Sequence, residues 1–408
     1  MERNIITTVS FGNNKVSISS IEKLSTNNVE IFTSSDDIKN TDIFLKSSLS
    51  KIETLVGGKV SNVTFVIEPS KNVNAKIELD TQPIKLVGET VAKTDISNVI
   101  GLLKVKYEGQ NDKRVTMVQP LKFQITSASG TKSYWQAPIN KHGDKLTMTA
   151  SITTISKKVY DYIYSLSKKL DVKIGQILLT SQVLPYSYIS RNALENGSVL
   201  INIDESHVNI SVNKAGGTLD TISLYKFGYR WLIKQLAKEF ACPKDEALSL
   251  LEAHGSFVSE KERVIFWNKF NNMSKKHTNT DLQRILGRYV VNLMSIAKKY
   301  LSQQNLFDLP IIVSGKLNSL SGFEKYLSKI LTNVSITAYK PLEFVEFNDK
   351  NADCLGAINF MDKMDLMLGS KCDTIVHTNP NTLNVPKTDT KNIVSWFKKK
   401  IGEIYDWN

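Results

Sequence analysis

Two strand-turn-strand units, one near the start of the chain and one near its middle, limit the folds that this sequence can adopt. The first is SFGNNKV at Ser10–Val16, and the second is NIDESHVNI at Asn202–Ile210. Apolar and polar residues alternate on both sides of the second turn, as they do in half-buried strands. A chain of 408 residues is also longer than a typical single domain. We therefore expect two or more domains.

Expected strands and helices alternate along most of the remaining sequence. Helical spacing or capping signals predict helices within residues 39–57, 85–103, 157–169, 229–240, 243–254, 260–271, 281–301 and 352–362, and one from about residue 321. Strands are expected at residues 63–67, 115–126, 145–154, 177–180, 310–315 and 334–338. Alternation of this kind indicates the α/β class, and the adjacent strand pairs indicate mixed sheets.

Charge and composition exclude several function classes. The net charge is +12, but Lys supplies most of it, while Arg, the usual reader of bases and phosphates, is scarce and scattered. We therefore expect no nucleic-acid partner, although the charge favours an anionic membrane. The three Cys lack C-x-x-C spacing and the five His fit no metal-ligand pattern, so no metal site is predicted. No apolar run reaches 18 residues, and we expect a chain that is neither secreted nor membrane-spanning.

The last 18 residues, 391–408, have the pattern of an amphipathic helix. They follow residues 376–390, a stretch rich in Asn, Thr and Pro that indicates a flexible linker. Two Trp, a Phe and a Tyr beside Lys residues are typical of a helix that lies in a membrane interface. Two alternatives are that this helix docks on the protein's own core or that it binds in the groove of a partner protein. The residues expected to bind membrane are Ile393, Val394, Trp396, Phe397, Lys398, Lys399, Lys400, Ile401, Ile404, Tyr405 and Trp407.

The two strand-turn-strand units resemble the phosphate loops of the superfamily that holds actin and the heat-shock chaperone ATPases. A third segment, IIVSGKLNSLSGF at Ile311–Phe323, resembles the adenosine loop of that superfamily. The order of segments is similar to one member, the bacterial cell-division protein FtsA. RVTMVQPLKFQI and DKLTMTASITTISKKVYDYI resemble parts of the small domain that this family inserts between the two phosphate loops. The family also ends in a flexible linker and a membrane-targeting amphipathic helix.

The resemblance implies an actin-like two-domain ATPase fold with mixed sheets, an FtsA-type inserted subdomain and a C-terminal amphipathic helix. The implied boundaries are residues 1–84 and 167–198 for the first domain, with 352–375 returning to it, 85–166 for the insertion, 199–351 for the second domain, 376–390 for the linker and 391–408 for the helix.

The loops depart from the family pattern where nucleotide would bind. Ser10 and Asn202 replace the two Asp residues that arrange Mg²⁺, and acidic Asp204 and Glu205 stand where the family has glycine. Lys316 and Leu317 fill glycine positions of the adenosine loop, and Leu248 and Leu251 replace the family's Glu and Lys contacts to ribose and adenine. The candidate nucleotide contacts are Gly12, Asn13, Asn14, Lys15, Asp204, Glu205, Ser206, Ser314 and Gly315. ATP is the only cofactor implied, Mg²⁺ is doubtful, and no catalytic residue is predicted.

The resemblance implies a cell-division protein that polymerises and tethers a tubulin-like division protein to the inner face of the plasma membrane, with weak or lost ATPase activity. The partner's C-terminal peptide, typically acidic, would bind within residues 229–301, where Arg230, Lys234, Arg284 and Arg288 are candidates. We also expect Lys15 to pair with Asp204 or Glu205 in place of phosphate. Two alternatives stay open: an actin-fold ATPase or sugar kinase that uses nucleotide, and the related pilus-assembly actin homologue.

Overall fold

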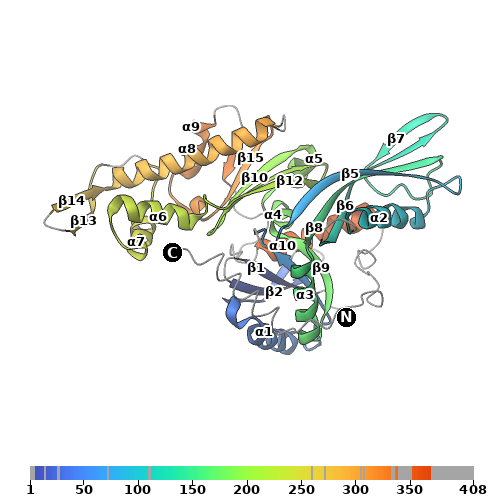
Figure 1. Ribbon diagram of the computed structural model, residues 1–408, viewed down its shortest axis with the longest axis horizontal. Helices are drawn as coiled ribbons and strands as arrows, with labels where there is room; N and C mark the ends of the chain where they lie inside the picture. The colour runs from blue at the N-terminus through green and yellow to red at the C-terminus, as the bar shows by residue number, and fades with distance from the viewer. Residues whose placement is uncertain are drawn as a thin grey trace. The chain divides into compact units, whose positions relative to one another are not determined.

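The structure is a computed structural model. It describes residues 5–12, 15–24, 28–70, 73–108, 112–258, 261–270, 273–303, 306, 308–331, 336–338 and 352–368. The chain forms two compact units (Figure 1). Unit 1 comprises Met1–Asn196, Asn213–Thr221 and Glu343–Asn408, and unit 2 comprises Gly197–Val212 and Ile222–Leu342.

The first sheet of unit 1 has the strand order β3-β2-β1-β4-β9. Its strands are β1 (Ile5–Gly12), β2 (Lys15–Lys23), β3 (Asn28–Asp37), β4 (Asn62–Ile67) and β9 (Lys173–Leu179). β1 and β2 form the first expected strand-turn-strand unit, with Gly12 opposite Lys15, while β4 runs parallel to β1. After the 3-10 turn η1 (Ile38–Asn40), α1 (Thr41–Val56) packs with α3 (Lys157–Leu170) against this sheet, each through one apolar stripe.

The second sheet of unit 1 has the order β5-β8-β6-β7, and three of its four strands lie within residues 85–166, for which an inserted subdomain is expected from the sequence. Its strands are β5 (Lys76–Lys85), β6 (Lys113–Ser127), β7 (Gly130–Tyr134) and β8 (Lys145–Ser156), and α2 (Lys93–Glu108) packs against it. The expected boundary at residue 85 falls at the end of β5, which is paired with β8 along its whole length. The strands β5 and β7 are not predicted from the sequence, although β5 alternates buried and exposed residues as half-buried strands do; β7 is exposed along most of its length.

Three helices complete unit 1: α4 (Thr180–Tyr188), α5 (Arg191–Asn196) and α10 (Ala352–Leu368). α4 and α10 pack very closely at Gly356, where an added Cβ would lie 2.2 Å from the carbonyl oxygen of Val183. The return of residues 352–368 to this unit therefore depends on a glycine that lets the two helices approach.

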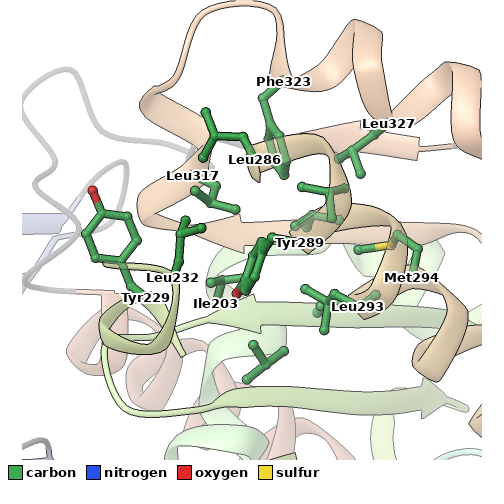
Figure 2. Close-up of a cluster of buried hydrophobic side chains, with 14 of the residues drawn as sticks. Ile203, Tyr229, Leu232, Leu286, Tyr289, Leu293, Met294, Leu317, Phe323 and Leu327 are labelled. Carbon is green, nitrogen blue, oxygen red and sulfur yellow. The ribbon is translucent and has the colours of Figure 1, made fainter. Parts of the chain in front are cut away.

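Unit 2 contains a sheet of order β12-β11-β10-β15-β16. The strands are β10 (Ser198–Ile203), β11 (Val208–Lys214), β12 (Gly217–Leu224), β15 (Ile311–Gly315) and β16 (Ile336–Ala338), with residues 213–221 assigned to unit 1. The helices are α6 (Tyr229–Phe240), α7 (Lys244–His254), α8 (Asn279–Gln303) and α9 (Phe323–Ile330), with the 3-10 turn η2 (Lys316–Ser319). Figure 2 shows side chains of α6, α8, α9, η2 and β10 meeting in one buried cluster.

The helix expected within residues 260–271 is wrong, because this stretch is the strand β13 (Val264–Phe270), paired with β14 (Met273–Thr278). Val264 to Trp267 is a run of β-branched and aromatic residues, which favours a strand over a helix. Side-chain packing also favours the pairing of β13 with β14. Phe266 and His277 lie opposite each other in the ladder, and both rings stack on Phe240 at the end of α6.

Within the described residues, no helix is both long and apolar enough to cross a membrane. The expected linker and amphipathic helix, residues 376–408, lie outside the described residues, as do Asn13 and Asn14.

Candidate functional site at the ends of β10 and β15

The turn between β10 and β11 is held by the first turn of α6. Within the turn, the N–H of Asp204 donates to the carbonyl of His207, and the N–H of Glu205 donates to Oδ1 of Asp204 at 2.6 Å. The N–H groups of Tyr229 and Arg230 then donate to the carbonyls of Asp204 and Glu205, both at 2.8 Å. The first N–H groups of a helix often bind anions, but these two already bind the turn.

Gly228 makes this close packing of the turn and α6 feasible. A Cβ at this position would lie 2.3 Å from the carbonyl carbon of Ser206 and 2.4 Å from the nitrogen of His207. Both neighbours are backbone atoms, which cannot move aside as a flexible side chain can. Glycine is therefore required at residue 228, where the start of α6 approaches the turn closely. The glycine precedes the helix and does not belong to the turn between β10 and β11.

Glu205 lies between two cations that come from different elements. Its Oε1 is 2.6 Å from Nζ of Lys316, which follows β15, and its Oε2 is 3.1 Å from Nη2 of Arg230, in the first turn of α6. The Glu205 side chain is 23% exposed, against 50% for Lys316 and 44% for Arg230. Burial acts to raise the pKa of Glu205, but the hydrogen bond and charge of Lys316, followed by the charge of Arg230, hold it below its ordinary value. We call these three residues the Glu205 ion triad.

Tyr229 forms one wall beside the triad. The Nζ of Lys316 lies 5.2 Å from the centre of the Tyr229 ring, within cation–π range. Burial, and then the negative charges of Glu252 and Glu205, raise the pKa of Tyr229 to about 12. The hydroxyl therefore stays protonated at neutral pH, and its ring lies at the edge of the apolar cluster in Figure 2.

β10 and β15 are parallel, so their carboxyl ends lie at the same edge of the sheet, where ligands of open α/β sheets bind. Asn202 and Ser314 are neighbours in this register, and the buried Ser314 hydroxyl donates to Oδ1 of Asn202 at 2.8 Å. Gly315 has a φ of +107°, and a Cβ there would lie 2.1 Å from the carbonyl oxygen of Ile203. A neutral amide held by a hydroxyl thus occupies the position at which the resemblance expects a magnesium-directing carboxylate.

His207 ends the turn in a chain of polar side chains. The Ser223 hydroxyl donates to Oδ1 of Asn209, which leaves the Asn209 amide nitrogen to donate to Nε2 of His207 at 2.8 Å. The hydrogen of neutral His207 is then on Nδ1, 2.8 Å from the hydroxyl oxygen of Ser206. His207 is 1% exposed, and burial lowers its pKa despite the opposing effects of Asp204 and Asn209. This imidazole is therefore a neutral element of the turn.

The turn between β1 and β2 in unit 1 has an acidic neighbour of its own. Glu68 directly follows β4, is 4% exposed, and donates its backbone N–H to the carbonyl of Phe11. A Cβ on Gly12 would lie 2.4 Å from Oε2 of Glu68. Each unit, taken by itself, thus has a carboxylate next to the turn that the resemblance assigns to phosphate. Lys15 is exposed and belongs to unit 1, whereas the cations on Glu205 belong to unit 2.

The four candidate partner-binding residues all lie on unit 2 helices. Arg230 belongs to the Glu205 ion triad, Arg284 pairs with Asp281 at 2.9 Å, and Arg288 pairs with Glu239 of α6 at 3.3 Å. Lys234 lies one turn after Arg230 on α6. Arg288 and Glu239 are both about half exposed, so their pair is worth at most about 1 kcal/mol and can be released cheaply.

Sequence reasoning missed Glu68 and the roles of Arg230 and Lys316 around Glu205. Glu68 carries a usable signal, because an acidic residue immediately after a buried parallel strand lies at the ligand-binding edge of a sheet. Arg230 gives a second sequence signal. A cation in the first turn of a helix is unfavourable next to the positive end of the helix dipole, so a nearby anion is expected to stabilise it.

No protein-family model matches the sequence, and no curated protein matches it significantly. Several solved structures are nevertheless similar to this chain in fold. The PilM–PilN type IV pilus biogenesis complex contains a chain that is 10% identical, with a TM-score of 0.50 over 90% of this chain and 97% of that one. MreB5 of Spiroplasma citri bound to AMPPNP is 9% identical, with a TM-score of 0.49 over 90% and 98%.

The chain has the actin-like ATPase fold. The expected fold class is therefore confirmed for the two units and their mixed sheets. Identities near 10% show the fold alone.

Proposed function

We propose that the chain is an FtsA-like scaffold that polymerises and tethers a tubulin-like division protein to the inner face of the plasma membrane, with weak or lost ATPase activity. The observation that carries this proposal is the Glu205 ion triad. A loop that binds triphosphate offers N–H groups and room, whereas this loop offers a carboxylate held in place by two cations.

The repulsion between the Glu205 carboxylate and a triphosphate can be estimated from Coulomb's law. Two like unit charges about 4 Å apart near a protein surface repel by about 4 kcal/mol, and a triphosphate carries several charges. The same carboxylate also takes up the two cations that would otherwise attract phosphate. Asn202 adds to this, since a neutral amide bound to Ser314 is a poor substitute for a carboxylate that arranges Mg²⁺. ATP turnover by this site would therefore be slow or absent.

The proposed membrane contact is the helix expected at residues 391–408, with its aromatic and basic faces. A single amphipathic helix binds lipid weakly and reversibly, so assembly of many copies would supply the avidity for stable attachment. The protein would lie on the cytoplasmic side, peripheral to the membrane, at the division site. The acidic C-terminal peptide of the tubulin-like protein would bind the basic side of α6 and α8, where Arg288 forms an exposed ion pair with Glu239.

Co-sedimentation with anionic vesicles, followed by electron microscopy of the pellet, tests the proposal. The full chain is expected to pellet with lipid and form filaments equally with and without ATP, and a chain lacking residues 389–408 is expected to stay in the supernatant. Unchanged lipid binding by the truncated chain would refute the membrane role. Filaments that form only in the presence of ATP would refute the proposal that assembly does not depend on nucleotide.

A second candidate function is pilus assembly, and the similarity to the chain in the PilM–PilN complex favours it. Such a protein would use nucleotide and would need no lipid-binding tail. Detectable ATP hydrolysis by the purified chain, combined with lipid binding that survives removal of residues 389–408, would favour this alternative over the scaffold.

A further inference from the structure

We propose that Lys316 and Arg230 form an oxyanion site at the carboxyl ends of β10 and β15, that Glu205 occupies this site as a built-in ligand, and that removal of the Glu205 carboxylate lets it bind a phosphoryl group. This inference rests on the proposed loss of nucleotide dependence at the same loop, but it adds a defined site, an occupant and a ligand class.

The Glu205 carboxylate is held as a bound anion would be, by two cations rather than by the single partner of an ordinary surface ion pair. Each carboxylate oxygen of Glu205 contacts a different cation, and the two cations come from the segments after β15 and at the start of α6. Two cations converging on one small anion is the arrangement by which proteins bind phosphate. The Tyr229 ring beside Lys316 adds a wall that restricts where the ammonium group can lie.

The backbone around the triad is fixed independently of the Glu205 side chain. The turn is held by the N–H groups of Tyr229 and Arg230 and by the close packing of Gly228, and Gly315 fixes the start of the segment that carries Lys316. These contacts use backbone atoms only. A variant that shortens Glu205 therefore leaves the backbone segments that carry Lys316 and Arg230 in place, so both cations remain within reach of an added anion.

Charge supports the choice of ligand. With Glu205 present the triad has a net charge of +1, and without its carboxylate the two cations carry +2 on neighbouring elements. The pKa of Glu205 is held below its ordinary value, so in the wild-type chain the carboxylate remains ionised and in place at neutral pH. An oxyanion with several oxygen atoms, such as inorganic pyrophosphate, can contact both cations at once, as Glu205 does.

Isothermal titration calorimetry of the full-length chain with pyrophosphate tests the proposal. Glu205→Ala is expected to bind pyrophosphate at least about tenfold more tightly than the wild-type chain, which corresponds to about 1.4 kcal/mol. The matched control is Glu239→Gln, which removes a carboxylate from α6 that, among the described residues, forms an ion pair with a single exposed arginine, Arg288. Glu205→Gln, which keeps the side-chain size, covers the case in which the alanine variant unfolds.

The proposal is overturned if both Glu205 variants gain no more affinity than Glu239→Gln, or if the gain survives when Lys316→Ala is added. ATP is titrated in parallel, because a nucleotide could supply the same phosphoryl chemistry. Equal gains for ATP and pyrophosphate support a phosphoryl site, while a gain confined to ATP would mean that base and ribose contacts carry the binding and would overturn it. The experiment contains no lipid, so its failure is distinguishable from failure of the tethering function.

Discussion

The hydroxyl of Ser314 donates to Oδ1 of Asn202 at 2.8 Å, which joins two neighbouring strands at the edge of the unit 2 sheet. Ser314 is fully buried, and its hydroxyl has an acceptor in this amide. The bond lies one residue before Gly315 and two before Lys316, so it helps to position the segment that supplies one cation of the Glu205 ion triad.

Asn202→Ala is expected to destabilise unit 2 by about 1–2 kcal/mol, because it leaves a buried hydroxyl without this acceptor. The double variant Asn202→Ala with Ser314→Ala is expected to be less destabilised than the sum of the two single variants. Urea unfolding of the four chains measures the coupling. Strictly additive effects would show that the bond contributes nothing to stability.

Gly228→Ala is expected to loosen the turn between β10 and β11, because its Cβ would meet the backbone of Ser206 and His207. Hydrogen exchange should be faster at the N–H groups of Tyr229 and Arg230, which bind the turn. We expect a loss of at least about 2 kcal/mol in stability, typical of steric overlap in a packed site.

Gly101→Ala is the control for this substitution, because a Cβ at that position on α2 meets nothing within 4 Å. Alanine is the better helix former by up to about 1 kcal/mol, so this variant should keep or raise stability. Equal destabilisation by both substitutions would contradict the close contact at Gly228.

His207 makes stability depend on pH in a defined direction. Its pKa is lowered in the folded chain from an ordinary value of 6.5, so the unfolded chain binds more protons between the two values. The contribution of the neutral imidazole is fully present above pH 6.5 and is lost as pH falls toward the folded pKa, at no more than about 1.4 kcal/mol per pH unit.

His207→Gln should therefore remove part of the loss of stability between pH 6.5 and pH 5, as measured by urea unfolding at each pH. The exposed His142 provides the matched control, and His142→Gln should leave the wild-type pH dependence in place. The buried role assigned to His207 fails if the two variants show the same pH profile.

Much of the fold follows from local pattern. α6 begins and ends where the spacing of its apolar residues predicts, and β10 and β11 follow the alternation around Asn202. The segment at residues 264–270 was mispredicted because its neighbours in space decide its structure. Phe266 fits a strand once His277 lies opposite it and Phe240 lies beneath both rings.

The sequence predicts a location for the candidate site, but it does not predict the contacts that the structure shows around Glu205. The turn at Asp204 and Glu205 stands out in the sequence because acidic residues occupy positions at which the family that it resembles has glycine. Which cation faces Glu205 could not be predicted, because Lys316 is 111 residues away in the chain and meets it only through the parallel pairing of β10 and β15.

Binding of an acidic peptide to α8 provides the last test. Arg284 and Arg288 are one turn apart on this helix, and their present partners, Asp281 and Glu239, are at least a third exposed. Such pairs exchange readily for a peptide carboxylate.

If the proposed partner, the C-terminal peptide of a tubulin-like protein, binds here, the double variant Arg284→Ala with Arg288→Ala is expected to weaken its binding by about tenfold, at about 0.7 kcal/mol for each contact. It should also reduce the dependence of affinity on salt, because fewer charged contacts remain to be screened. Arg191→Ala, which removes another exposed arginine, on α5 of unit 1, is the control and should bind as the wild-type chain does. Fluorescence anisotropy of the labelled peptide at about 50 and about 200 mM salt measures both effects, and an unchanged affinity in the double variant would contradict the proposed contact with α8.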